Sequence, residues 1–197
     1  MVRALIVAAL TVGPMCLPAS AAEVGKTSPE FAIRFPDGSQ KLLSSYRGKV
    51  VCVEFLHTTC PHCQHASQVF SQLYTQYGDK GFQPLGVAWN DMASLLVQDF
   101  IRDFRVNYPV GYAPRDEVLT YLGFTASDRT VVPQLVWIDR KGVVRSQTPA
   151  IGDENKLREP YWLQMIDTLT KESGPSPAHK AAPHHAHSTP AKPSNQS

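Results

Sequence analysis

Two cysteines stand two residues apart, directly after an apolar run, and this arrangement constrains the fold more than any other feature. The run Val50–Leu56 begins with β-branched residues and is too short for a typical helix, so it predicts a strand buried on both faces of a mainly parallel sheet. After Cys60-Pro61-His62-Cys63, apolar residues recur at helical spacing up to Gly78. Thr58 or Thr59 is expected to cap this helix. The pattern therefore predicts a strand, a short turn and a helix that opens at the cysteine pair.

The spacing of the cysteines predicts redox chemistry. Two intervening residues let both sulfurs reach disulfide distance within one helical turn. Cys60 stands where unpaired backbone N–H groups and the positive end of the helix dipole favour an anion, so we expect its thiolate to form at lower pH than that of a free cysteine. Cys60 is therefore the predicted nucleophile, and Cys63, one turn further on, is predicted to resolve a mixed disulfide.

The remaining patterns predict a layered α/β domain with a mixed sheet. Strand, helix and hairpin signals alternate along the chain in the order that such domains show. The expected elements are a hairpin-like segment in 28–49 with a turn at 36–38, a strand over 82–89, a helix capped by Asp91 that buries residues up to 104, a hairpin over 135–145, and a last helix with Trp162, Met165, Ile166 and Leu169 on one face.

The two ends of the chain differ from this core. Arg3, the apolar run 4–12 and the small residues of 19–21 predict a secretory signal peptide over residues 1–21. An uncleaved anchor is less favoured, because the run is roughly half of the ~20 residues that span a bilayer. Residues 173–197 are rich in Pro, Ala and His and predict a disordered tail after a domain over 22–172. We therefore expect a periplasmic or secreted protein with no stable membrane span after cleavage.

The cysteine motif and four other segments resemble the thioredoxin superfamily, and more closely the periplasmic TlpA/ResA-like thiol-disulfide oxidoreductases that share a redoxin core. The matching residues are Pro29-Glu30-Phe31, Tyr46-Arg47-Gly48-Lys49-Val50-Val51, Cys60-Pro61-His62-Cys63, Val132-Pro133 and Ile138-Asp139-Arg140-Lys141-Gly142. The resemblance spans roughly residues 28–169. It implies a thioredoxin-like α/β fold, with a central mixed β-sheet flanked by helices and an N-terminal β-hairpin extension.

The same resemblance assigns roles to three further residues. Pro133 is implied to be a cis-proline that lies against the disulfide and helps to dock an extended substrate, and the backbone of Val132 would meet that substrate. Glu54 lies six residues before Cys60, where thioredoxins carry a buried aspartate that relays a proton. A lone buried carboxylate has a raised pKa and exchanges protons near neutrality. The alternative is that Glu54 reaches a sheet edge or pairs with a basic residue.

Other residues are expected to modulate the reaction or to face the substrate. The pair Pro61-His62 also occurs in strongly oxidising DsbA-type proteins, and an imidazole beside Cys60 favours the thiolate and hence a stronger oxidant. Thr59 stands where the family usually carries tryptophan, which changes the surface offered to a substrate. Trp89 follows a strand that should end at the same sheet edge as Cys60. A substrate contact is one interpretation of Trp89, and a core position, which general burial habits favour, is the other.

The sequence also contains two cysteines outside the motif, and it argues against several other functions. Cys16 is expected to leave with the signal peptide, and Cys52, on the same strand face as Glu54, is expected to be a buried thiol rather than a partner of Cys63 in a regulatory disulfide. Haem attachment is excluded, because Gln64 follows Cys63 where that motif needs histidine. A peroxidase is disfavoured, because the resemblance to peroxiredoxins would require Pro and Thr where Val53 and His57 stand. A net charge of +2 argues against nucleic-acid binding.

The favoured function is an exported thiol-disulfide oxidoreductase with no cofactor and no resident metal. Its partners would be protein thiols or disulfides and a membrane redox donor or acceptor, with reduction slightly favoured over oxidation. The alternative is a copper chaperone of similar fold, in which His62, His65 and the two cysteines supply soft ligands together with the tail histidines His179, His184, His185 and His187. Copper chaperones of this fold, however, place three residues between their cysteines.

Overall fold

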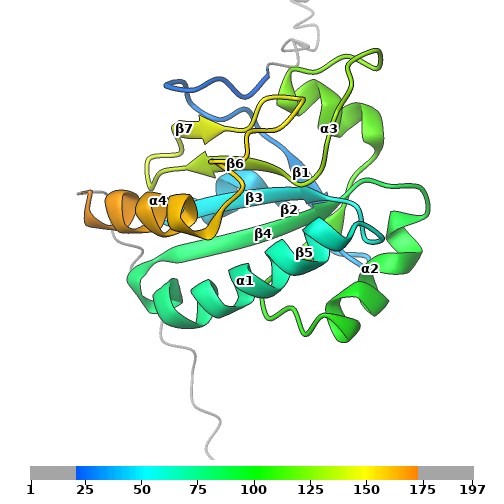
Figure 1. Cartoon of the computed structure of the whole chain (residues 1–197), viewed down its shortest axis with the longest axis horizontal. Helices are drawn as coiled ribbons and strands as arrows, with labels where there is room; N and C mark the ends of the chain where they lie inside the picture. Colours follow the sequence, from blue (N-terminus) through cyan, green and yellow to red (C-terminus); the bar gives the residue numbers. More distant parts are fainter. Residues whose placement is uncertain (1–20, 173–197) are drawn as a thin grey trace, which may run out of the picture.

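A computed structural model describes residues 21–172 of the chain (Figure 1). Within these residues, seven strands form one mixed sheet in the order β2-β1-β5-β4-β3-β6-β7. The elements in chain order are β1 (Ala32–Arg34), β2 (Gln40–Leu42), the 3-10 turn η1 (Leu43–Tyr46), β3 (Val50–Leu56), α1 (Pro61–Tyr77), η2 (Gly78–Lys80), β4 (Phe82–Ala88), α2 (Ala93–Asp103), β5 (Val110–Tyr112), α3 (Arg115–Leu122), β6 (Gln134–Ile138), β7 (Val144–Gln147) and α4 (Glu159–Lys171). The predicted central mixed sheet with flanking helices is confirmed.

Strand β3 lies near the middle of the sheet and all seven of its residues are buried. It pairs in parallel with β4, from Val50 opposite Phe82 to Leu56 opposite Ala88, and antiparallel with β6. Helices cover both faces of this strand, which is why an unbroken apolar run was needed to form it. The predictions of a doubly buried strand here and of a mixed sheet are confirmed.

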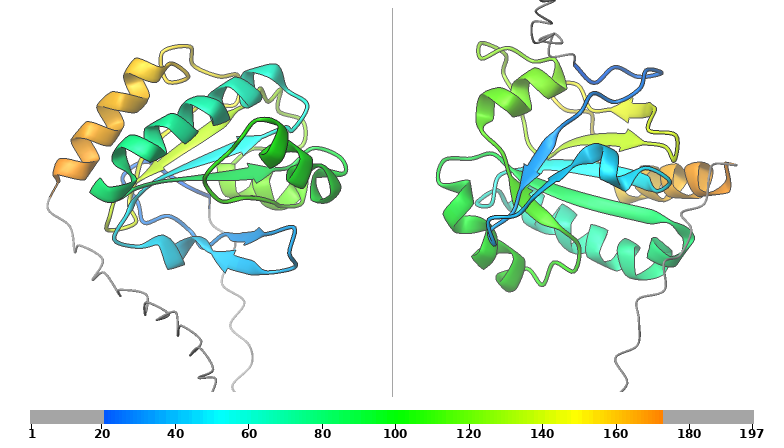
Figure 2. Two further views of the ribbon diagram at one scale, coloured as in Figure 1. Left: turned by 90° about the horizontal axis from the view of Figure 1, so that it is seen from below. Right: turned by 180° about the vertical axis from the view of Figure 1, so that it is seen from behind.

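The helices divide between the two faces of the sheet, as Figure 2 shows. On one face α1 and α4 pack against the strands, and their contact includes the stacked rings of Phe70 and Trp162, whose centroids are 4.5 Å apart. On the other face α3 and the N-terminal segment enclose a second core, in which Phe31, Phe55 and Tyr121 contact one another at 4.9–5.5 Å. Each face thus has its own apolar core, and β3 contributes side chains alternately to both.

The N-terminal hairpin extends the sheet beyond β5. Strands β1 and β2 pair antiparallel around the predicted turn, and Arg34 of β1 pairs with Tyr112 of β5. This pairing depends on Gly111, because a Cβ at that position would lie 2.3 Å from the carbonyl oxygen of Arg34. The absence of a side chain therefore allows the two backbones to approach.

Two expected helix caps are wrong. Helix α1 begins at Pro61 with Cys60 as its N-cap and no side-chain capping bond, because Thr58 is buried and hydrogen-bonded elsewhere. Helix α2 begins at Ala93 after Met92, which adopts a left-handed conformation with φ 58°, so Asp91 does not cap it. Strand β5 and helix α3 were not expected from the sequence.

Some of the sequence predictions concern the two ends of the chain, outside residues 21–172. Apart from Ala21, the predicted signal peptide lies outside the described residues, and so do Cys16, the predicted tail and the tail histidines. The boundaries predicted at residues 22 and 172 therefore stay predictions. Between residues 21 and 172, no helix combines the length and the apolar character that crossing a membrane requires.

Candidate active site

The carboxyl ends of β3 and β4 and the start of β6 meet at one edge of the sheet, and the cysteine motif lies there. The turn after β3 brings Cys60 to the N-cap of α1, where its backbone N–H donates to the carbonyl oxygen of His57 at 3.1 Å. The carbonyl oxygen of Cys60 accepts from the N–H of Gln64 at 3.0 Å. Cys60 itself is half-buried. A partly exposed cysteine thus stands at a helix N-terminus.

Cys63 lies one turn into α1 and is fully buried. Burial, and next the charge of Glu54, raises the pKa of the Cys63 thiol, while a backbone hydrogen bond from His57 lowers it in part. Cys60 and Cys63 are both free thiols in the structure. The pair therefore combines one accessible sulfur with one buried sulfur that needs a base before it can react.

Glu54 is the buried acid beside this thiol, with 1% of its surface exposed. Its Oε2 accepts hydrogen bonds from Ser67 Oγ at 2.8 Å and from the Tyr108 hydroxyl at 3.0 Å. Its Oε1 has no hydrogen-bond partner among the described residues. Burial raises the pKa of Glu54 to about 7, although the two hydrogen bonds act in the opposite direction. The interpretation that Glu54 reaches a sheet edge is wrong, because β3 is an inner strand, and within residues 21–172 no basic residue pairs with it.

Ser67 and Tyr108 were not identified from the sequence. Ser67 is fully buried on the face of α1 that also buries Cys63 and Ala66, so a polar residue on an apolar helix face was the available signal. Tyr108 comes from the segment before β5 and lies 54 residues from Glu54 in sequence. No local spacing indicates such a contact.

The segment before β6 lies against the reactive sulfur. The Val132–Pro133 peptide bond is cis, the isomer that the family resemblance implies. The Cys60 thiol lies 3.9 Å from the carbonyl oxygen of Val132, within hydrogen-bond distance for sulfur. Pro133 is buried and Val132 is half-buried. The structure thus brings Val132 to Cys60, with Pro133 next in the chain, and the role of both residues in docking a substrate stays a prediction.

A hydrogen-bonded clamp holds the turn that carries Cys60. The backbone N–H of Thr58 donates to Asn90 Oδ1 at 2.9 Å, and Asn90 Nδ2 donates to Thr58 Oγ1 at 3.1 Å. Gln64 Nε2 donates to the carbonyl oxygen of Thr58 at 3.0 Å. Asn90 follows β4, so this clamp joins the ends of two neighbouring strands through Thr58. Its pairing across 32 residues could not be read from the sequence.

The residues predicted to modulate the pair differ in exposure. Thr59, Pro61 and His62 are exposed on the surface beside Cys60. Trp89 is 4% exposed and belongs to the second core, which agrees with the core interpretation and not with a substrate-facing role. Its ring contacts the imidazole of His57, at 4.7 Å between centroids, and lies under the guanidinium of Arg115 at 5.1 Å.

The structure also bears on two alternative roles of the cysteines, a regulatory disulfide of Cys52 and metal binding by Cys60 and Cys63. Cys52 is fully buried and free, and burial raises the pKa of its thiol, as expected for an inert core cysteine. No group of three or more His, Cys, Asp and Glu side chains able to hold a metal ion occurs in the described part of the chain. His62 and His65 are exposed residues of α1, and they do not form such a group with Cys60 and Cys63.

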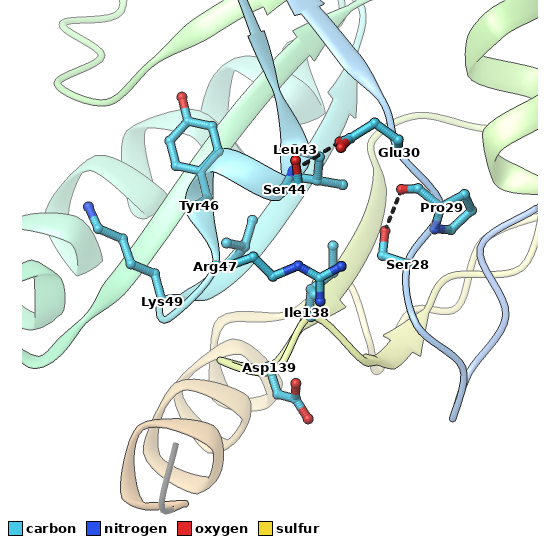
Figure 3. A pocket seen from close by; sticks show the side chains of 12 residues that line it. Ser28, Pro29, Glu30, Leu43, Ser44, Tyr46, Arg47, Lys49, Ile138 and Asp139 are labelled. Carbon is cyan, nitrogen blue, oxygen red and sulfur yellow. Dashed lines mark hydrogen bonds between the residues drawn. The ribbon is translucent and has the colours of Figure 1, made fainter. Parts of the chain in front are cut away.

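A cavity of about 160 Å³ lies at the opposite end of β3, away from the cysteines (Figure 3). It lies between the segments around Tyr46–Val51 and Ile138–Gly142, together with residues 28–30. Glu30 accepts from the backbone N–H of Ser44 at 3.0 Å, and Arg47 donates to the carbonyl oxygen of Lys141. No cysteine lines it. Three of the segments that carry the family resemblance therefore meet at this end of β3, opposite the cysteine motif.

Comparisons with known proteins agree with this geometry. The model of the AhpC/TSA family matches residues 24–147. Thiol-disulfide oxidoreductase ResA of Bacillus thuringiensis subsp. konkukian is 24% identical over 144 residues, which cover 73% of this chain and 79% of the relative. The ResA of Geobacillus kaustophilus is 30% identical over 126 residues, which cover 64% and 69%.

A solved structure shows the same fold. The thioredoxin-family thiol:disulfide interchange protein of Chlorobium tepidum TLS superposes with a TM-score of 0.62 at 22% identity, covering 76% of this chain and 99% of its own. At 22% identity, this structural similarity is evidence for the fold alone. With the family match over residues 24–147 and the ResA relatives, it leads to one conclusion: the chain belongs to the AhpC/TSA family, as a TlpA/ResA-like thiol-disulfide oxidoreductase of the thioredoxin superfamily.

Proposed function

We propose that the chain exchanges a Cys60–Cys63 dithiol/disulfide with the disulfides of exported proteins, with reduction as the favoured direction. The observation that carries this proposal is the placement of Glu54. A carboxylate with one oxygen that has no hydrogen-bond partner within residues 21–172 is buried beside the Cys63 thiol, and the partly exposed Cys60 stands at the N-terminus of α1. This arrangement provides an attacking sulfur, a resolving sulfur and a proton acceptor in one site.

The first step takes place at Cys60. Its thiolate attacks one sulfur of a substrate disulfide, so that an S–S bond forms between Cys60 and the substrate while the substrate S–S bond breaks. The departing substrate sulfur leaves as a thiolate and takes up a proton from solvent.

The second step uses Cys63 and Glu54. Glu54 accepts the proton of the buried Cys63 thiol, and the resulting thiolate attacks the Cys60 sulfur. The Cys60–Cys63 disulfide forms and the mixed disulfide breaks, which releases the second substrate thiolate. The substrate has then gained two electrons and the protein has lost two. A pKa of about 7 suits Glu54 to this transfer near neutral pH.

The surrounding residues complete the proposal. Pro133 and Val132, beside the Cys60 sulfur, would position the substrate backbone. Thr59, Pro61 and His62 would tune the pair or face the substrate from the exposed surface around it. A membrane redox donor would return the disulfide to the dithiol. Location in the periplasm, or secretion, rests on the signal-peptide pattern of residues 1–21.

Trapping the mixed disulfide tests this mechanism. The variant Cys63→Ser should accumulate a covalent complex with a disulfide-bonded protein such as insulin, because the complex forms but is not resolved. The variant Cys60→Ser should form no complex and should lose insulin reduction. Full activity of Cys60→Ser would contradict the assignment of the nucleophile.

The reduction potential of the pair tests the direction. A value near about −270 mV would identify a reductant, and a value near about −120 mV an oxidant, as the Pro61-His62 pair suggests. Binding assays with Cu(I) test the chaperone alternative. Tight stoichiometric binding that is lost in Cys63→Ser, without dithiol turnover, would support that alternative against the proposed exchange.

A further inference from the structure

Gln134 is a fully buried glutamine at the start of β6, next in the chain to the segment that contacts the reactive sulfur. The four residues of β6 that follow it, Leu135–Ile138, are all apolar. A buried side-chain amide costs free energy unless its polar atoms find hydrogen-bond partners. The partners of this amide therefore indicate why a polar side chain stands at the head of an apolar strand.

The nitrogen of the Gln134 side chain ties two segments together. It donates to the carbonyl oxygen of Val131 at 2.8 Å, and to those of Pro149 and Ala150 at 3.2 Å each. The two N–H groups of one amide are thus shared among three backbone acceptors. Val131 belongs to the segment before β6, whereas Pro149 and Ala150 follow β7. One buried side chain therefore joins the two segments.

The oxygen of the same amide is also held. It accepts from the Thr148 hydroxyl at 2.6 Å, and this hydroxyl accepts in turn from the backbone N–H of Leu135 at 2.9 Å. The backbone N–H of Thr148 donates to the carbonyl oxygen of Leu135 at 3.0 Å. Thr148 is 2% exposed. Both ends of the Gln134 amide thus have partners, and these partners fix which way the amide faces.

The segment that Gln134 holds is the one beside Cys60. Its hydrogen bond to Val131 spans the two residues that lie between them in the chain. The N–H of Val131 donates to the carbonyl oxygen of Ala150 at 2.9 Å, so Val131 is bonded through both its N–H and its carbonyl group. Val132 follows it, and its carbonyl oxygen lies 3.9 Å from the Cys60 sulfur. The place of Val132 is therefore fixed from both sides along the chain.

We propose that Gln134 is a positioning residue for the exchange, whose buried amide holds Val132 in place beside the Cys60 sulfur so that a protein substrate meets an ordered segment. The inference rests on the proposed function, in which this segment positions the substrate backbone. A segment that is ordered before binding saves the entropy of ordering it in the complex. Gln134 itself touches no substrate and acts through Val132.

Kinetics with two disulfides test this role. One is a peptide dimer joined by a single disulfide, and the other is 2-hydroxyethyl disulfide, which has no chain to lie along Val132. Gln134→Met keeps the length of the side chain and removes its hydrogen bonds. We expect the ratio of kcat/KM for the peptide to kcat/KM for the small disulfide to fall about tenfold, through KM for the peptide. An unchanged ratio would overturn the proposal.

Gln83 offers a matched control at the other end of the sheet. It is 3% exposed in β4, where its side-chain nitrogen donates to the carbonyl oxygen of Pro84 at 3.0 Å and its oxygen accepts from Lys49 Nζ at 2.9 Å. Gln83→Met removes a buried amide of the same kind, so it should lower the free energy of unfolding but leave the ratio as in the wild type. An equal fall of the ratio in both variants would show a general effect of lost stability and would also overturn the proposal.

Two variants of Thr148 keep the test open if Gln134→Met does not fold. Thr148→Val removes the hydroxyl that orients the Gln134 amide and should lower the ratio in the same direction. Thr148→Ser retains the hydroxyl and should restore the ratio of the wild type. Equal ratios in these two variants would contradict the role of Gln134. Failure of the wild type to react with 2-hydroxyethyl disulfide would instead overturn the proposed function on which this role rests.

Discussion

The raised pKa of Glu54 is the result of opposing effects on its carboxyl group. Its place on an inner strand removes water from both oxygens, and this desolvation disfavours the charged form. Ser67 and Tyr108 donate to Oε2 only, so the charged form is supported on one side while Oε1 stays without a partner in the described structure. A carboxyl group balanced in this way near neutral pH can both accept and return a proton beside Cys63.

The pH dependence of stability gives the first prediction for Glu54. Its folded pKa of about 7 lies above the ordinary value of 4.5, so the folded protein holds this proton more tightly than the unfolded chain. The stabilisation is fully present below pH 4.5 and is lost as the pH rises through 7. We expect a loss of roughly 3 kcal/mol in the free energy of unfolding across this window. Glu54→Gln should remove this loss, as urea unfolding at pH 5 and pH 8 would measure.

Glu30 supplies a matched control of opposite sign. Hydrogen bonds from Ser44 and Phe31 lower the pKa of Glu30 although burial acts against them. Glu30 therefore stabilises the folded protein above its ordinary pKa of 4.5, and this stabilisation is lost as the pH falls below that value. Glu30→Gln should change the free energy of unfolding at acidic pH and leave its slope between pH 5 and pH 8 unchanged. An unchanged slope between pH 5 and pH 8 in Glu54→Gln would contradict the raised pKa. In single-turnover assays, Glu54→Gln should also slow release of the mixed disulfide and abolish its increase with pH around 7.

At the scale of elements, local pattern decided which parts could be predicted. Strand β3 and helix α1 were recognised because an unbroken apolar run and a helical period each extend over many residues. Strand β5 has three residues, one of them Gly111, and offers no period to detect. Helix α3 has only eight residues, and Gly123, with φ 74°, is the one local signal of its end.

The candidate site was predictable to the extent that it is local in sequence. The two cysteines and Glu54 fall within ten residues of one another, and the family resemblance implied Pro133. Tyr108, one partner of Glu54, and Asn90, the partner of Thr58, were missed because their contacts join segments that are 54 and 32 residues apart. The predicted cap at Thr58 failed for the same reason, since Thr58 bonds to Asn90 and is not free to cap α1. Tertiary contacts decided each of these cases.

The joint between β1 and β5 gives a prediction at the element scale. Gly111→Ala would place a Cβ 2.3 Å from the carbonyl oxygen of Arg34 and 2.6 Å from the side chain of Ile33, so β1 must move. We expect a destabilisation of about 1–3 kcal/mol, typical of overpacking at a rigid contact. Chemical denaturation measures it. Gly78→Ala is the control, because Gly78 has φ −57° and its added Cβ would meet only the Tyr74 ring. Equal stability of both variants would show that β1 is not closely packed there.

At the scale of the whole molecule, the two ends of β3 lead to two different regions, the cysteine motif and the cavity. Its carboxyl end leads into the cysteine motif, and its amino end joins the segments that enclose the cavity of Figure 3. Seven extended residues span about 20 Å, so the two ends are far apart for direct contact. The segments that carry the family resemblance therefore divide between chemistry at one end and packing at the other. Substitutions near the cavity should affect stability before they affect exchange.

Backbone pairing at the start of the described chain leads to the last prediction. Gly25 donates its N–H to Val144, and Val144 donates back to Lys26, at 2.8 and 2.9 Å. Ser28 donates to Gly142 at 2.8 Å, and Ala22 donates to Tyr121 at 2.8 Å. The segment thus lengthens the sheet along β7 and also reaches α3. A chain that begins at residue 31 should lose these bonds.

Comparing truncated chains by thermal unfolding measures this contribution. Four backbone hydrogen bonds at about 1 kcal/mol each, and about 2–4 °C per kcal/mol for a domain of this size, give an expected decrease in Tm of roughly 10 °C for residues 31–172 relative to 22–172. Residues 22–172 should unfold at the temperature of the full chain, because the domain is predicted to lie between these limits. A lower Tm of 22–172 would place the domain boundary outside them. An unchanged Tm of 31–172 would mean that the backbone pairing of residues 22–30 contributes little to the stability of the domain.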